Sequence, residues 1–126
     1  MSNYFSIHNH TEYSNLRLLD CINKVEDLIQ YAFDIGLEGI CITDHETLSA
    51  HIKALKYYKQ QCAQDPKWKN FKLGLGNEIY LCRNGMNAEN FEKGEKFPHF
   101  ILVAKDAIGH KQLRELSSRA WSHSFN

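Results

Sequence analysis

Short apolar runs alternate along this sequence with stretches whose apolar residues recur at helical spacing, and that alternation limits the folds open to the chain. The apolar runs predict strands at residues 4–8, 39–43, 72–81 and 99–104. The helical spacing predicts helices at residues 24–35, 49–63 and 107–121. A polar, glycine-containing stretch predicts a loop at residues 84–98. The resulting order, β-α-β-α-β-β-α, is typical of an α/β fold with a largely parallel sheet and helical crossovers.

The length of the chain limits how far such a sheet can extend. Its 126 residues allow one compact domain and no more. Three βα units are too few to close a barrel of about eight strands. We therefore expect either an open sheet or the first part of a larger domain, with no linker and no second domain within these residues.

The charge balance and the hydropathy pattern exclude several classes of protein. Fifteen Lys and Arg residues balance fifteen Asp and Glu residues, so the net charge is zero with histidine neutral. Tight electrostatic binding to duplex DNA is therefore not expected, and any contact with nucleic acid must be local. The apolar runs are far shorter than the roughly 20 residues of a membrane helix, and the N-terminus lacks the features of a secretory signal. We expect a cytoplasmic protein that makes no membrane contact.

His8 and His10 end the first predicted strand and are the first candidate metal ligands. Side chains two positions apart on a strand share a face, so both imidazoles can reach one metal ion. Two surface histidines at the start of a loop would give the same pattern, so the pair needs its context. That context is Thr43-Asp44-His45, which closes the second predicted strand. Because ligands gather beyond the carboxyl ends of strands in α/β sheets, His10 and His45 are expected to approach each other.

Four further side chains are candidates with open alternatives. Glu78 lies in an otherwise apolar strand, where burying a carboxylate is costly unless a cation, hydrogen-bond donors or an ordinary salt bridge meets it. Asp44 is either a functional carboxylate or the cap of the next helix. His99 begins the fourth predicted strand and lies close to Glu78 only if that strand runs antiparallel to the third. Asp20 is either a ligand or a solvated loop residue.

Lysine and aromatic residues interleave between positions 53 and 72, and two interpretations fit them. They can form a surface for single-stranded DNA, or a solvated helix face with apolar anchors, which the balance of charge favours. The residues are Lys53, Lys56, Lys59, Lys67, Lys69 and Lys72 with Tyr57, Tyr58, Trp68 and Phe71.

The remaining histidines and the cysteines have no ligand context. The histidines have helical neighbours and are expected at the surface; they are His51, His110 and His123. The cysteines form no Cys-x-x-Cys pair and are expected as reduced thiols, with Cys41 buried in a strand. They are Cys21, Cys41, Cys62 and Cys82.

Six motifs follow one another in a characteristic order along the chain. They are His8-x-His10, Ser14, Leu19-Asp20, Ile42-Thr43-Asp44-His45, Gly76-Asn77-Glu78-Ile79-Tyr80, and the segment from His99 to Lys105 followed by Gly109 and Leu113. This series resembles the PHP family of metal-dependent phosphoesterases, and it is most similar to the version at the start of bacterial DNA polymerase III alpha subunits. Each motif alone is unspecific, whereas the ordered series over essentially the whole chain is specific.

The resemblance implies a fold and a set of ligands. Members of the family fold as a distorted (β/α)7 barrel, so residues 1–126 would form about the first half of a PHP barrel, as one truncated domain. Asp44 and Glu78 are the residues expected to act in catalysis, and Glu78 can also bridge two ions. The implied metal ligands are His8, His10, Asp20, His45, Glu78 and His99. This mixture of imidazole and carboxylate ligands suits divalent ions, with zinc or manganese ahead of iron or magnesium.

The resemblance also implies an activity. PHP domains hydrolyse phosphate esters, which in some polymerases serves as a 3′–5′ exonuclease, while in others the ligands are degenerate and the domain is structural. We expect a phosphoesterase module that reaches DNA through its parent polymerase. The alternatives are a non-catalytic metal-binding platform and a free-standing phosphatase acting on a small ester such as histidinol phosphate. Because the family's remaining ligands lie beyond Asn126, we also expect the rest of the domain, or a second copy, to complete the site, and little turnover without it.

Overall fold

The computed structural model describes residues 3–82 and 96–124, and its elements follow the predicted order. They are β1 (Phe5–Ser6), the short 3₁₀ helix η1 (Glu12–Leu16), α1 (Val25–Asp34), β2 (Gly39–Ile42), α2 (His51–Gln64), the short 3₁₀ helix η2 (Pro66–Asn70), β3 (Lys72–Tyr80), β4 (His99–Val103) and α3 (Ala107–Ser124). Most of the predicted loop at residues 84–98 lies outside the described residues. The first strand is shorter than predicted, so His8 and His10 lie beyond it in an irregular segment.

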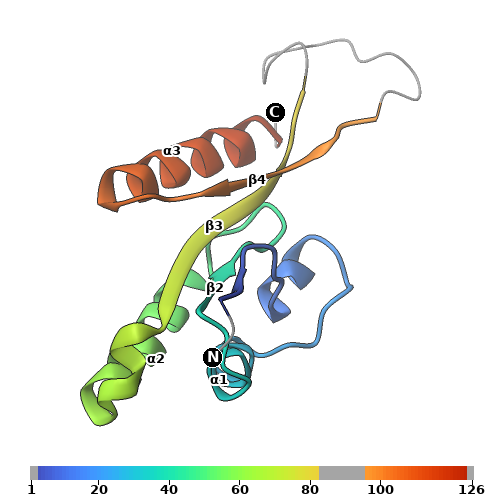
Figure 1. The fold of residues 1–126 in the computed structure, drawn as a ribbon. Helices are drawn as coiled ribbons and strands as arrows, with labels where there is room; N and C mark the ends of the chain where they lie inside the picture. The colour runs from blue at the N-terminus through green and yellow to red at the C-terminus, as the bar shows by residue number, and fades with distance from the viewer. Residues whose placement is uncertain (1–2, 83–95, 125–126) are drawn as a thin grey trace.

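The four strands form one sheet in the order β1-β2-β3-β4, curled into an incomplete barrel (Figure 1). β1, β2 and β3 are parallel, and β4 returns antiparallel to β3. The first half of β3 pairs with β2, from Gly39 opposite Lys72 to Ile42 opposite Leu75, and its second half pairs with β4. This mixed α/β sheet confirms the predicted partial barrel.

The parallel part of the sheet holds the hydrophobic core. α1 and α2 pack against each other and against β2 and β3. The Trp68 ring, 2% exposed, stacks on Phe33 with ring centroids 4.0 Å apart, and Phe71 is buried beside it. Burial removes Trp68 and Phe71 from any single-stranded DNA surface, so the interpretation of residues 53–72 as a helix face with apolar anchors is confirmed. Cys41 is buried as predicted, and burial raises the pKa of its thiol to about 12.

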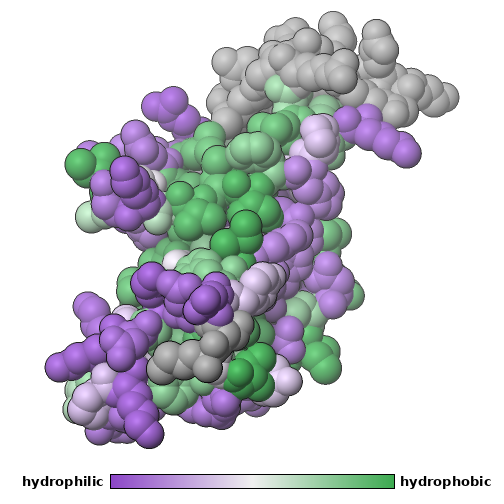
Figure 2. Space-filling view, viewed as in Figure 1, coloured by the Kyte–Doolittle hydropathy of each residue, from purple (hydrophilic) through white to green (hydrophobic). Residues whose placement is uncertain are grey.

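The antiparallel part is covered less completely. α3 packs along β3, and Leu113 is its buried apolar residue among the side chains that the structure describes. Phe100 and Val103 of β4 and Ile108 of α3 stay exposed. Figure 2 shows apolar residues gathered on the face between α3 and the layer formed by α1 and α2.

His51 is buried, and the prediction that it lies at the surface is wrong. Its Nε2 faces the Gly76 carbonyl oxygen at 2.8 Å, so this nitrogen carries the hydrogen and Nδ1 accepts from His110 Nε2 at 2.9 Å. His110 Nδ1 in turn accepts from the Arg114 guanidinium. Burial lowers the pKa of His51 to about 4, which keeps the ring neutral at neutral pH. Sequence spacing could not reveal a contact between residues 59 positions apart.

No helix among the described residues is long and apolar enough to cross a lipid bilayer. The cysteines among the described residues are free thiols, as predicted.

Candidate metal centre

The pairing of β2 with β3 brings His45 and Glu78 together. The register of the two strands continues past their regular ends to a parallel bridge between these residues. The Glu46 amide donates to the Glu78 carbonyl at 2.9 Å, and the Glu78 amide donates to the Asp44 carbonyl at 3.0 Å. Two predicted candidates from separate strands therefore meet at the carboxyl ends of the parallel strands, where α/β folds gather ligands.

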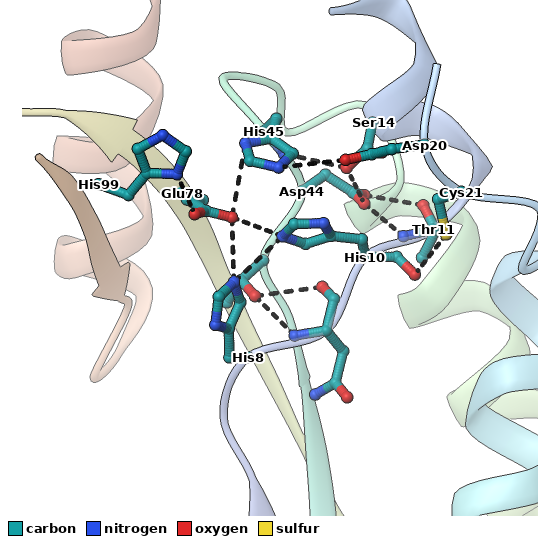
Figure 3. Close-up of polar contacts among 12 residues, drawn as sticks. His8, His10, Thr11, Ser14, Asp20, Cys21, Asp44, His45, Glu78 and His99 are labelled. Carbon is teal, nitrogen blue, oxygen red and sulfur yellow. Dashed lines mark hydrogen bonds and ion pairs between the residues drawn. The ribbon is translucent and has the colours of Figure 1, made fainter. Parts of the chain in front are cut away.

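The Glu78 carboxylate is the centre of the cluster (Figure 3). It is 3% exposed, and its Oε2 lies 3.0 Å from His8 Nε2 and 2.5 Å from His10 Nε2. Its Oε1 lies 2.7 Å from His99 Nδ1. Burial alone would raise the pKa of this carboxyl, but hydrogen bonds from the three histidines outweigh burial and lower the pKa to about 2. Glu78 is therefore ionised over the whole physiological range.

The antiparallel return of β4 places His99. Tyr80 lies opposite His99 across the ladder, so Glu78 is the diagonal neighbour of His99 on the same face. The sequence left the direction of this strand open, and the antiparallel alternative is the observed one.

Asp20 joins the cluster from the loop before α1. Its Oδ2 lies 3.6 Å from His45 Nε2, and the carboxylate is nearly half exposed. On the other side of the same ring, His45 Nδ1 lies 3.5 Å from Glu78 Oε2. The structure thus brings together all six predicted ligands, from the segment after β1, the loop before α1, the end of β2, β3 and β4.

The ligand atoms fall into three overlapping sets in which all atoms lie within 4.8 Å of one another. The sets are His8, His10 and Glu78; His10, Asp20 and His45; and His45, Glu78 and His99. Nitrogen and oxygen atoms bound at about 2.1 Å to one tetrahedral ion lie roughly 3.4 Å apart, close to the distances from His45 to Glu78 and Asp20, 3.5 Å and 3.6 Å. His45 Nδ1 is also buried without a hydrogen-bond partner among the described residues. A metal ion bound there would satisfy this nitrogen. The donor set therefore fits divalent metal ions.

Asp44 lies beside the cluster and holds the segment that follows His10. Its buried carboxylate accepts from the Thr11 amide at 2.5 Å, from the Thr11 hydroxyl at 2.8 Å and from the Ser14 hydroxyl at 3.0 Å. Ser14 Oγ then accepts from the His45 amide at 3.1 Å. These bonds join Thr11, which follows His10, to Asp44, which precedes His45. They do not test the predicted catalytic role of Asp44.

Asn9 fixes the two histidines that flank it, and sequence reasoning did not identify this role. Its amide donates to the Thr43 hydroxyl, while its carbonyl accepts from the Thr43 amide, each at 2.9 Å. Its side chain donates to the carbonyls of Ser6 and Cys41. The irregular segment is therefore held against the end of β2 by hydrogen bonds to Cys41 and Thr43. The available signal was the side-chain amide at the middle of the His-x-His motif.

An open hollow of about 330 Å³ lies next to the cluster. Three candidate ligands, His8, His10 and Asp20, line this hollow, together with Asn9, Cys21, Asn23 and Leu28. A small phosphate ester is of a size to enter this space.

Comparisons with known proteins agree with the cluster. A profile described as PHP domain matches residues 6–126. A DNA-directed DNA polymerase of Bacillus phage SPbeta is 45% identical over 120 residues, which make up 94% of this chain and 9% of that protein. The DNA polymerase III alpha subunit of Borreliella burgdorferi is 30% identical over 125 residues, or 98% of this chain and 10% of that protein. The chain therefore spans about a tenth of the length of these relatives.

One solved structure shows the shared fold. It is described as a metal-dependent phosphoesterase from Bifidobacterium adolescentis, and it aligns with a TM-score of 0.58 at 19% identity. The alignment covers 91% of this chain and 33% of that one.

Proposed function

The chain belongs to the PHP domain family, and on that premise we propose that it is a metal-dependent phosphoesterase module of a replicative DNA polymerase III alpha subunit. The observation that carries the proposal is the convergence of four imidazoles and two carboxylates on one end of the sheet. Residues 1–126 would be the N-terminal part of the PHP domain, and the rest of the domain or a second copy would complete the ligand set.

His8, His10, His45, His99, Asp20 and Glu78 would hold the ions, with zinc or manganese preferred over iron or magnesium. A divalent ion supplies hydroxide at neutral pH and neutralises the charge that develops on a phosphate. Glu78 belongs to two of the three sets. Because its carboxylate is buried and ionised, it would bind the ions of both sets. Asp44 would contribute by holding the loops of His10 and His45 in place, in addition to its predicted catalytic role.

The substrate would be a phosphodiester at the 3′ end of a DNA strand, delivered by the parent polymerase. Similarity to two DNA polymerases supports this choice over a free-standing phosphatase. A cytoplasmic location follows from the same proposal.

Hydrolysis of a 3′-labelled oligonucleotide tests the proposal. With manganese or zinc added, we expect slow release of nucleotide by this chain, abolished in Glu78→Gln because the shared ligand is lost. Glu38→Gln is the matched control, since Glu38 is only partly buried and pairs with Lys72 at the opposite end of the strands. Equal hydrolysis by the two variants would contradict the proposal.

A non-catalytic platform is the second candidate, and the ligand contacts favour it as well. An ion bound by His45, Glu78 and His99 would join the end of β2 to β3 and β4. In that case a chelator would lower the melting temperature by several degrees, while no variant would show metal-dependent hydrolysis.

A further inference from the structure

Helix α3 carries an uneven distribution of charge. It contains three cationic residues, Lys111, Arg114 and Arg119, and one acidic residue, Glu115. The chain as a whole is neutral, so this helix is a local concentration of positive charge. Lys111, Arg114, Ser118 and Trp121 recur every three or four residues and therefore share one face of the helix.

This face borders two hollows that share Arg114 and Ser118. One, of about 550 Å³, lies between α3 and the loop after β2 and reaches Thr47, Ser49 and Trp121. The other, of about 410 Å³, continues along α3 to Lys111. We call the two hollows together the α3 groove and define it by Thr47, Ser49, Lys111, Arg114, Ser118 and Trp121. Its lining also includes the acidic Glu115, the cationic Arg119, and Leu16, Leu48 and Ser117.

A single loop separates the α3 groove from the metal centre. The Trp121 indole Nε1 donates to the Glu46 carbonyl at 2.8 Å, which fixes the ring against this loop. The preceding residue, His45, is one of the metal ligands proposed above, and the Glu46 amide is bound to the Glu78 carbonyl. The end of the groove at Trp121 is therefore the end nearest to the ligands.

The chemistry of the groove matches one kind of ligand. The cations at positions 111 and 114 suit phosphate groups, and the exposed Arg114 is oriented by its contact with His110 Nδ1. The hydroxyls of Thr47 and Ser49 are adjacent, 2.9 Å apart. Phosphate-binding cations followed by an aromatic ring are the usual elements of a single-strand binding surface.

We propose that the α3 groove binds a segment of single-stranded nucleic acid and directs its phosphodiester toward the metal centre. The second part of this inference rests on the proposed phosphoesterase function, whereas binding in the groove does not. The cations hold the backbone, and Trp121 stacks on the base that precedes the scissile end.

The test is binding of a fluorescein-labelled eight-residue oligothymidylate to this chain, in chelator and low salt, measured by fluorescence anisotropy. The double variant Lys111→Gln/Arg114→Gln should bind at least about tenfold more weakly, and the slope of log affinity against log salt should fall by about 1.4, at about 0.7 for each lost phosphate contact. The double variant Lys56→Gln/Lys59→Gln removes the same charge from the face of α2 and should bind like the unmodified chain.

If Lys111→Gln/Arg114→Gln folds poorly, two single variants test the same groove. Arg114→Lys retains the charge and should recover most of the binding. Trp121→Phe should abolish the quenching of tryptophan fluorescence by the oligonucleotide, because the second tryptophan, Trp68, is buried in the core.

Equal affinity in the groove and control variants would overturn the inference. So would binding that is unchanged in Trp121→Phe and equally displaced by any polyanion, or groove variants that alter self-association of the chain and not oligonucleotide binding. Groove-dependent binding without hydrolysis after manganese is added would contradict only the proposed function. Hydrolysis that is indifferent to the groove variants would contradict only this inference.

Discussion

The two halves of the sheet differ in what covers them. The parallel half, formed by β1, β2 and the start of β3, lies under α1 and α2, and every residue of β2 is buried. The antiparallel half, formed by the end of β3 and β4, lies beside one helix and leaves Phe100 and Val103 47% exposed. The candidate metal centre lies where the halves meet, so its candidate ligands differ in how they are held.

His10 and His45 are held by the parallel half. Asp44, Ser14 and Thr11 connect their segments through buried hydrogen bonds, and the strand register fixes His45 beside Glu78. His99, by contrast, is held by the β3–β4 ladder, by one hydrogen bond with Glu78 and by ring contacts with Tyr80 and His45. The comparison indicates that the parallel half forms a prearranged part of the site and that the antiparallel half forms an adjustable part.

The largest expected effect separates the two halves by stability. Trp68→Ala removes a buried, stacked ring from the parallel half and should lower the free energy of unfolding by about 3–5 kcal/mol. Phe100→Ala removes a half-exposed ring of β4 and should cost less than about 1 kcal/mol. Urea unfolding of both variants measures the difference. Equal losses would break the comparison.

Protonation of His51 should weaken the connection between the halves. Its pKa is about 4 in the folded chain, against about 6.5 when unfolded, so between these values the unfolded chain binds a proton that the folded chain does not. Stability should therefore fall as the pH is lowered through this window, by up to about 3 kcal/mol.

The groups that face His51 are His110, whose pKa is also lowered by burial and by Arg114, and Asp44, which favours the charged ring. Urea unfolding at several pH values from 7 to 4 should give a shallower pH dependence for His51→Gln than for the unmodified chain. Identical slopes would show that His51 is not the group responsible.

Two glycines of β3 lie on either side of the boundary between the halves, Gly74 in the parallel half and Gly76 in the antiparallel half. A Cβ at Gly76, opposite Val103, would lie 2.4 Å from the Leu102 carbonyl oxygen, which is backbone and cannot move aside. A Cβ at Gly74, opposite Cys41, would meet the Cys41 sulfur at 3.0 Å. Gly76→Ala should thus cost about 1–3 kcal/mol and Gly74→Ala less, as measured by thermal unfolding. The opposite ranking would contradict the observed packing.

The smallest expected effect is a gain of stability in the antiparallel half. Gly109 lies in the first turns of α3, and a Cβ there would meet its nearest neighbour, the Ala104 Cα, at 3.5 Å, an ordinary contact. Gly109→Ala should therefore raise the free energy of unfolding by about 0.5–1 kcal/mol through helix propensity alone. A loss of stability in the same unfolding assay would show that α3 is packed more tightly than its exposure indicates.

The sequence predicted the parts of this molecule that depend on local pattern. The element order could be predicted, and so could the approach of His10 and His45, because strand-ending motifs of parallel strands meet at one edge of the sheet. The full set of six candidate ligands followed only from the resemblance to the PHP family. The position of His99 depended on a strand direction that no local pattern fixes.

Tertiary contacts explain the remainder. Nothing near His51 in the sequence shows that Gly76 and His110 enclose it, and nothing near Asp44 shows that Thr11 and Ser14 occupy its carboxylate. The α3 groove likewise forms between segments some seventy positions apart, as the bond from Trp121 to Glu46 shows.

Titration with Mn²⁺, followed by electron paramagnetic resonance, tests most directly whether these imidazoles and carboxylates form a metal centre. The unmodified chain and Glu38→Gln should bind the ion with equal affinity, and Glu78→Gln should bind it more weakly by a factor of roughly 100. Binding by Glu78→Gln that matches the unmodified chain would contradict the account.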